Sequence, residues 1–292
     1  MPVRTPPRIS RQTILRDHSA RLRAMYRAML TVLGPQGWWP GRTRFEVIVE
    51  AILTQNTAWT NVARAVANLR QARVLTPRAL ATLPTPRLAR LIRASGYYRT
   101  KASRVKRFVR FLRARYRLDL WRMFRVRPSR LREQLLAVPG IGPETADSIL
   151  LYAGQVPAFV VDAYTRRILE RHGLIRPDAT YDAVQALFMS RLPPDAALYN
   201  EYHALIVAVG KDFCRPVPRC ERCPLRRDLE QYHPAAARRF LAFRRKDTKA
   251  GKASPSRLPP SALGPWRSAL GSACALTPSA ATRGRCTRPR RR

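Results

Sequence analysis

A glycine-containing turn and one carboxylate are the residues of this chain that could do chemistry together. The turn at residues 138–142 reads Val-Pro-Gly-Ile-Gly, and Asp162 follows about twenty residues later. Gly140 and Gly142 can adopt a positive φ, which lets the backbone approach a ligand closely. Pro143 suits the first position of a helix whose exposed N–H groups would face the turn. Such a turn binds an anion without a cationic side chain, so the pattern predicts a phosphate-binding turn followed by a candidate catalytic acid.

The charge of the chain indicates a polyanionic partner. It has 56 Lys and Arg residues against 18 Asp and Glu, for a formal net charge of +38. Enzymes of small neutral metabolites do not need this excess, whereas each phosphate neutralised by a basic side chain releases counterions. A genome rich in G and C would also increase the arginine content. The charge therefore supports DNA binding without establishing it.

The composition also indicates in which cellular compartment the protein is expected. No apolar run approaches the roughly 20 residues of a membrane span, and the basic N-terminus lacks the apolar segment of a signal peptide. Three of the five cysteines are clustered, which fits a metal site in a reducing compartment better than a disulfide framework. We expect a cytoplasmic, nucleoid-associated monomer that does not contact a membrane.

The elements that must position the turn and the acid are predicted to be short helices, so the expected fold class is all-α. No period-2 pattern is long enough for a sheet. Residues 45–53 are apolar around most of the helix circumference, which predicts a buried helix. Thr76 and Thr85 each precede a proline and are expected as helix N-caps, and Gly96 as the end of the second helix. Further helices are expected at residues 101–115, 163–172, 181–191 and 196–209.

These motifs resemble the helix-hairpin-helix and Gly/Pro-Asp module of the endonuclease III superfamily of DNA glycosylases. Three further stretches are similar to segments of that superfamily, at residues 34–40, 51–57 and 95–102. The first, Gly-Pro-Gln-Gly-Trp-Trp-Pro, resembles the aromatic stretch of the 3-methyladenine DNA glycosylase III, or endonuclease III-related, branch. The third resembles a helix–helix corner. Together these similarities cover roughly residues 30–225.

The resemblance implies a two-lobed helix-hairpin-helix DNA glycosylase fold with the active cleft between the lobes. Residues 45–158 would form a helical bundle containing the hairpin, and residues 16–44 and 159–233 the second lobe, with its cysteine loop. Residues 1–15 are expected to be disordered. Residues 234–292 are rich in basic residues, Ser, Pro and Ala without a helical period, and are expected to form a disordered basic tail.

Roles for individual residues follow from the resemblance. Asp162 would be the catalytic aspartate, and Gln55 would fill the gap left by a nucleotide flipped out of double-stranded DNA. Trp38 and Trp39 would form the base pocket, because indole faces attract a cationic ring. Structural alternatives exist for each: Asp162 would also cap the helix at residues 163–172, Gln55 could cap between helices, and the tryptophans could anchor the N-terminal helix. The phosphate grip would come from Gly140, Ile141 and Gly142.

One residue departs from the pattern of the glycosylases that also nick the strand. These carry a lysine just after the hairpin, whose amine attacks the sugar to form a Schiff base. This chain has Glu144 there, and it has no lysine between Lys106 and Lys211. The sequence therefore predicts a monofunctional enzyme that leaves an abasic site. His203, in an apolar helix, is given no role.

The spacing Cys214-x5-Cys220-x2-Cys223 is typical of a metal site. It resembles the [4Fe–4S] loop of the superfamily, in which a fourth cysteine follows about six residues beyond the third. Here that place is Leu229. The fourth ligand could be His233 or a tail cysteine (Cys274 or Cys286), three thiolates with His233 could bind zinc, or the sequence could diverge near Leu225.

The sequence thus predicts a base-excision repair N-glycosylase. It would remove alkylated purines such as 3-methyladenine, whose glycosidic bond is already weakened, by base flipping and hydrolysis assisted by Asp162. One alternative is an endonuclease III-like glycosylase and AP lyase for oxidised pyrimidines or mismatched thymine. The other is a catalytically inactive helix-hairpin-helix DNA-binding protein.

Overall fold

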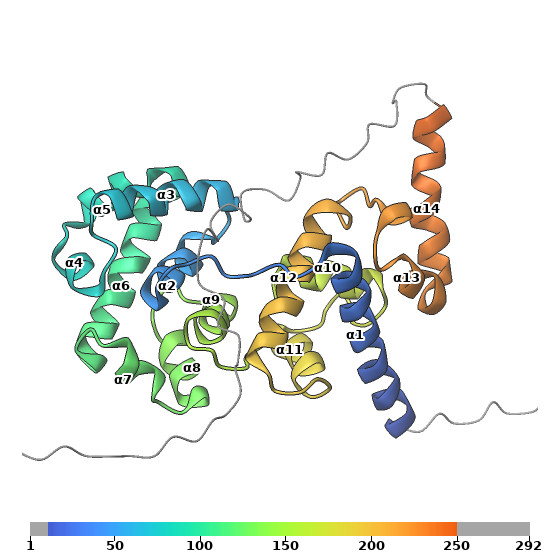
Figure 1. Cartoon of the computed structure of the whole chain (residues 1–292), viewed down its shortest axis with the longest axis horizontal. Helices are drawn as coiled ribbons and strands as arrows, with labels where there is room; N and C mark the ends of the chain where they lie inside the picture. The colour runs from blue at the N-terminus through green and yellow to red at the C-terminus, as the bar shows by residue number, and fades with distance from the viewer. Residues whose placement is uncertain (1–10, 250–292) are drawn as a thin grey trace, which may run out of the picture. The chain divides into compact units, whose positions relative to one another are not determined.

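The computed structural model describes residues 11–249, with side chains from residue 18 to residue 241, and this part of the chain contains helices and no strand (Figure 1). The predicted all-α class is confirmed. The helices fall into two groups.

The first group holds the hairpin. Helix α2 packs against α6, α9 and the π-helical turn η2, and α5 packs along α6. Its members in chain order are α2 (Arg44–Leu53), α3 (Trp59–Gln71), α4 (Pro77–Thr82), α5 (Thr85–Leu91), the 3-10 turn η1 (Arg93–Ser95), α6 (Tyr98–Tyr116), α7 (Leu120–Phe124), α8 (Pro128–Leu136), α9 (Pro143–Ser148) and η2 (Ile149–Ala153).

The second group holds Asp162 and the cysteines. Helix α12 packs against both α10 and α1, and the Tyr202 hydroxyl donates to the carbonyl oxygen of Leu22 at 2.8 Å. Its members are α1 (Arg11–Leu33), α10 (Ala163–Arg171), α11 (Tyr181–Met189), α12 (Ala196–Asp212), the 3-10 turn η3 (Cys220–Arg222), α13 (Arg226–Tyr232) and α14 (Pro234–Lys249).

Helix α2 is the central element of the first group. Thr43 caps it by accepting a hydrogen bond from the Glu46 N–H at 3.2 Å, and every residue from Phe45 to Leu53 is buried. This confirms the predicted buried helix. Its two acids are satisfied inside the protein: Glu46 pairs with Arg70, and Glu50 accepts from the Trp39 indole.

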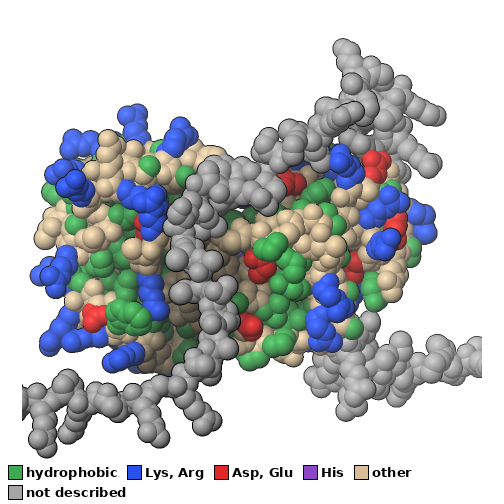
Figure 2. All heavy atoms as spheres, viewed as in Figure 1, with side chains coloured by type: hydrophobic (Ala, Val, Ile, Leu, Met, Phe, Trp, Pro, Cys, Tyr) green, Lys and Arg blue, Asp and Glu red, His purple; other side chains and the backbone are tan. Residues whose placement is uncertain are grey.

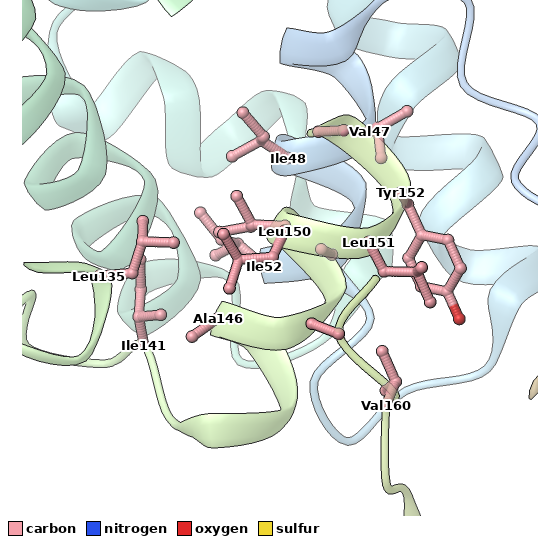
Figure 3. Close-up of a cluster of buried hydrophobic side chains, with 14 of the residues drawn as sticks. Val47, Ile48, Ile52, Leu135, Ile141, Ala146, Leu150, Leu151, Tyr152 and Val160 are labelled. Carbon is pink, nitrogen blue, oxygen red and sulfur yellow. The ribbon is translucent and has the colours of Figure 1, made fainter. Parts of the chain in front are cut away.

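The hairpin is fixed by an apolar core beneath it. Ile141 lies in the turn, and its side chain is 4 % exposed. Figure 3 shows Ile141 beside Leu135 of α8, with Ile52 of α2 and Leu150 of η2 in the same cluster. The turn is therefore attached to the core by its middle residue, which leaves the two glycines at its surface.

Some predicted boundaries shift. Thr76 caps α4 as expected, but Thr85 is the first residue of α5 and Pro84 precedes it as the N-cap, so that expectation is wrong. Gly96, with φ +65°, ends η1 rather than α5. Helix α1 begins at Arg11, and α14 extends from Pro234 to Lys249 inside the segment expected to be a tail. Residues 250–292, the rest of that segment, lie outside the described residues.

On the face shown in Figure 2, basic side chains lie mainly toward the edges of both groups of helices, with several acidic side chains among them. Within residues 11–249, no helix is both long and apolar enough to span a membrane.

Candidate active site

A cavity of about 440 Å³ is lined by side chains from both groups of helices. This volume is in the range of small-molecule sites. The cavity brings together five residues singled out from the sequence: Asp162, Trp38, Trp39, Gln55 and Glu144. The other lining residues are Ala51, Thr54, Thr57, Ala58, Trp59, Thr60, Thr145, Ser148, Val160, Tyr164, His203, Val207 and Lys211.

Asp162 has one oxygen fixed and one facing the site. As expected, it is the N-cap of α10: its Oδ1 accepts from the Thr165 N–H at 2.7 Å and from the Thr165 hydroxyl at 2.8 Å. Its Oδ2 lies 3.7 Å from His203 Nε2, and the side chain is 13 % exposed. Capping therefore uses one oxygen and orients the other, so the cap and a catalytic role are compatible.

His203 lies behind Asp162. The Tyr152 hydroxyl and His203 Nδ1 are 2.5 Å apart, whereas His203 Nε2 is buried and makes no hydrogen bond with the described residues. Burial lowers the pKa of His203, against an opposing effect of Asp162, so the ring is neutral at neutral pH. If Tyr152 donates to Nδ1, the remaining ring proton is on Nε2 and is directed at Asp162.

Aromatic rings form one wall. The Trp39 ring centroid lies 4.8 Å from that of Tyr152 and 5.4 Å from that of Trp59. The Trp39 indole N–H donates to Glu50 Oε2 at 2.6 Å. Trp38 lies 5.3 Å from Trp39 between ring centroids. Trp39 is therefore fixed by contacts with α2, α3 and η2, and both tryptophan rings line the cavity.

Two ionisable groups complete the cavity. Glu144 lines it and is exposed to solvent, but the loss of hydration next to the surrounding protein, and then the Asp162 charge, raise the pKa of Glu144 to about 7. Lys211 also lines it, with its Nζ 5.8 Å from the centroid of the Trp38 ring. Burial lowers the pKa of Lys211. An amine therefore does reach the cavity, although it lies far from Glu144 in the sequence.

The hairpin differs in part from the expectation. Gly140 has φ +97°, but Gly142 has φ −92° and serves as the N-cap of α9, so only one of the two glycines needs a positive φ. The Ile141 N–H donates to the Val138 carbonyl oxygen at 3.0 Å, which removes it from the set of free donors. Within the described residues, the amides of Gly140 and Gly142 have no acceptor and remain available to an anion.

Gln55 is held against the hairpin. Its Nε2 donates to the Gly140 carbonyl oxygen at 3.1 Å and to Thr145 Oγ1 at 2.8 Å, and its Oε1 accepts from Arg104. Arg104 also packs on the turn, because a Cβ at Gly140 would lie 2.6 Å from Arg104 Cγ. The cavity and the hairpin are thus linked through one side chain.

The cysteines lie apart from this cavity. Cys214, Cys220 and Cys223 share a small cavity of about 20 Å³ with Leu229, which is 3 % exposed. That volume is comparable with a single water molecule. Burial raises the pKa of the Cys220 thiol to about 11 and that of Cys223 to about 12.

The described residues do not complete a four-ligand site. An apolar side chain, Leu229, occupies the place of the fourth ligand, and no group of three or more His, Cys, Asp or Glu residues suited to a metal occurs among the described side chains of residues 18–241. His233 packs against Gly173, where its Cδ2 would lie 2.8 Å from an added Cβ. Cys274 and Cys286 lie outside the described residues. The [4Fe–4S] cluster therefore stays a prediction.

Polar contacts hold this loop. Asp228 of α13 accepts two hydrogen bonds from Arg21, at 2.8 and 2.9 Å, and lies 2.6 Å from His172 Nδ1. Arg171 donates to the Cys214 sulfur at 3.3 Å and to two loop carbonyl oxygens, and Arg167 donates to the Cys214 carbonyl oxygen at 2.7 Å. These contacts connect the cysteine loop and α13 to α1 and α10.

Sequence reasoning missed several residues of the cavity. Trp59, Tyr164, His203 and Lys211 belong to amphipathic helices and carry no motif. A signal was present for His203 and Lys211. Together with Val207 they are spaced by four residues along α12, which places the three on one helix face.

The all-helical fold, the glycine hairpin and the following acid define a helix-hairpin-helix glycosylase. A family model described as the HhH-GPD superfamily base excision DNA repair protein matches residues 49–194. The chain belongs to this superfamily, and it is accordingly a DNA repair glycosylase.

Three proteins illustrate the similarity. A candidate DNA repair glycosylase of Methanocaldococcus jannaschii is 44 % identical over 69 % of this chain and 92 % of its own length. Endonuclease III of Thermotoga maritima is 34 % identical over 64 % of this chain and 83 % of its own. The structure of H. pylori 3-methyladenine DNA glycosylase (MagIII) bound to 1,N6-ethenoadenine matches with a TM-score of 0.57 and 29 % identity, covering 66 % of this chain and 97 % of that one.

Proposed function

We propose that the protein is a monofunctional glycosylase that removes alkylated purines, such as 3-methyladenine, from double-stranded DNA. The observation that carries the proposal is the pairing of Asp162 with an aromatic wall in one cavity, where the hairpin side presents Glu144 in place of an amine. The similarity to a 3-methyladenine DNA glycosylase that is seen with an alkylated adenine supports the choice of substrate class.

The reaction follows from Asp162. A flipped base enters the cavity, and positive charge develops on the sugar as the bond from C1′ to the base nitrogen breaks. The electron pair of that bond leaves with the base and neutralises its positive charge. The Asp162 Oδ2 stabilises the charged sugar and orients a water molecule, whose oxygen bonds to C1′ while its proton passes to the carboxylate or to solvent. The products are a free base and an abasic site.

His203 positions this carboxylate. Its Nε2 lies 3.7 Å from Asp162 Oδ2, too far for a hydrogen bond in this state. His203 Nε2 has no hydrogen-bond partner among the described residues, so a small shift of Asp162 Oδ2 toward the ring would form a hydrogen bond if Nε2 carries the proton. Thr165 on one oxygen and His203 near the other thus define the direction in which the acid faces.

Lys211 opens a second candidate function. Its amine lines the cavity and its pKa is lowered, which are the properties of a lysine that attacks a sugar. An endonuclease III-like lyase using Lys211 is therefore the alternative. Against it, the amine lies over the Trp38 ring, on the wall where a base would stack, rather than beside Glu144 at the hairpin.

The test separates base release from strand cleavage. The protein is incubated with duplexes containing 3-methyladenine, thymine glycol or a G·T mismatch, and free base and strand breaks are measured separately. Release of 3-methyladenine, with breaks only after alkali, is expected. Borohydride should trap no covalent adduct; an adduct that disappears in Lys211→Met would establish the lyase instead.

A gain-of-function variant sharpens this test. Glu144→Lys places an amine at the hairpin beside Asp162, and it should create an adduct that borohydride traps. The matched control is Glu133→Lys on α8, an exposed glutamate outside the cavity, which should create none. If neither variant forms an adduct while base release persists, the type of residue at position 144 does not determine whether the enzyme acts as a lyase.

A further inference from the structure

Beside the hairpin, but outside the cavity of Asp162, lies a hollow of about 350 Å³. Its walls are one face of α6, the end of α8 and the first residues of the turn. Arg107, Arg110 and Arg115 contribute from α6, and Pro139 forms the rim toward the hairpin. We call this the α6 hollow.

The lining of the α6 hollow is suited to an anion. It contains three guanidinium groups and the Gln134 amide, and no acidic side chain. All three arginines are exposed. Arg110 and Arg115 donate no hydrogen bond to another described residue, and Arg107 makes a single long one of 3.4 Å to the Pro139 carbonyl oxygen. Three like charges line one hollow, and no acidic side chain of the described residues lines it with them; like charges repel, and a bound anion reduces that repulsion.

The position of the hollow identifies the anion. Arg107 contacts the turn at Pro139, and the available amides of Gly140 and Gly142 follow directly in the chain. A nucleic-acid strand held at those amides has neighbouring phosphates on each side, and the α6 hollow lies next to the turn. Guanidinium groups match phosphate oxygens in geometry and charge.

We infer that the α6 hollow binds consecutive backbone phosphates of the same DNA strand that contacts the hairpin, so that α6 extends the DNA footprint away from the cavity. This inference rests on the proposed action on duplex DNA. It assigns a role to Arg107, Arg110 and Arg115, which neither line the cavity of Asp162 nor belong to the hairpin turn.

The experiment measures binding in the Asp162→Asn background, so that the duplex stays intact. The triple variant Arg107→Ala/Arg110→Ala/Arg115→Ala should bind about tenfold or more weakly at moderate salt. The slope of log K against log salt should fall by about one for each phosphate that the variant no longer neutralises. The control is Arg113→Ala, an exposed arginine of α6 that does not line the hollow. Arg113→Ala should change neither the affinity for the duplex nor the salt slope.

A neutral-phosphate scan locates the contact. Duplexes carry one methylphosphonate linkage at successive positions along the strand. With the parent protein, affinity should fall at two or three consecutive linkages on one side of the hairpin contact. With the triple variant, those same linkages should cause no further loss, since coupled groups are not additive.

Two results would overturn the inference: an equal loss in the Arg113 control, which indicates net charge alone, or the same scan profile for parent and triple variant. Circular dichroism spectra of all variants exclude misfolding as the cause. Failure of the proposed function is distinguishable, because it would show as absent base release by the unmodified protein while the scan still maps the hollow.

Discussion

The cavity around Asp162 and the loop around Cys214 were both singled out by short motifs, but the structure supports the two motifs differently. In the cavity, the motif residues lie together with residues that belong to no motif, such as His203 and Trp59. In the loop, three cysteines come together around Leu229, and the surrounding contacts are made by arginines and Asp228. A motif marks where segments meet, and the contacts around it decide whether the expected chemistry is complete.

The largest effect is expected at Asp162. Asp162→Asn retains the oxygen that caps α10 but loses the negative charge, so base release should fall by about a thousandfold or more while duplex affinity changes little. Single-turnover release of 3-methyladenine and equilibrium binding measure the two quantities. A parallel loss of binding would make Asp162 a structural residue, and the contrast between the two regions would disappear.

The loop is expected to depend on Asp228 for stability. Asp228→Asn leaves the Arg21 guanidinium, which is 6 % exposed, with an incomplete partner, so the free energy of unfolding should fall by about 3 kcal/mol. The matched control Asp178→Asn breaks an exposed pair with Arg176 and should change it by less than about 1 kcal/mol. Urea unfolding gives both values.

The same measurement tests the cysteines. Replacing Cys214, Cys220 and Cys223 together by serine should reduce stability less than Asp228→Asn does, if the polar contacts are what hold the loop. Iron and sulfide analysis of the unmodified protein accompanies this comparison. If the unmodified protein contains iron and the cysteine variant loses more stability than Asp228→Asn does, the cysteines rather than the polar contacts hold the loop.

These two regions also show how far sequence reasoning extends. Helices such as Arg44–Leu53 were predictable because apolar spacing and a threonine cap specify them locally. The helix cap at Asp162 was predictable from local sequence, whereas its expected catalytic role came from its distance downstream of the hairpin, which matches the superfamily. Lys211 of α12 and Trp59 of α3 line the same cavity through tertiary packing of helices that are separate in the sequence. Spacing alone could place each of them on a helix face but not in the site.

A smaller effect is expected at the aromatic wall. Trp38→Ala removes a ring that lines the cavity, so release of 3-methyladenine at limiting enzyme should fall by about tenfold, corresponding to one stacked base. Trp121 is the control: it is 69 % exposed, lies outside the cavity, and its replacement by alanine should leave release unchanged. Equal losses in both variants would contradict a base pocket at Trp38.

The smallest effect concerns pH. Burial raises the pKa of Glu50 to about 7. At pH 6 the unfolded chain has already ionised this carboxyl while the folded chain retains its proton, so stability should fall by about 1 kcal/mol between pH 6 and pH 8. Glu50→Gln, which can still accept from the Trp39 indole, should remove this component. An unchanged pH dependence in the variant would assign the effect to other groups.

Gln55 already uses both ends of its amide, toward Gly140, Thr145 and Arg104. If Gln55 fills the gap left by a flipped nucleotide, as the resemblance implies, its side chain must leave this position to enter the duplex and give up three hydrogen bonds. Opening an intact base pair adds a further cost, whereas a damaged or mismatched pair opens at a lower cost. In that role the docked glutamine would raise the free energy of entering undamaged DNA by an amount that the resting protein sets before any lesion is met.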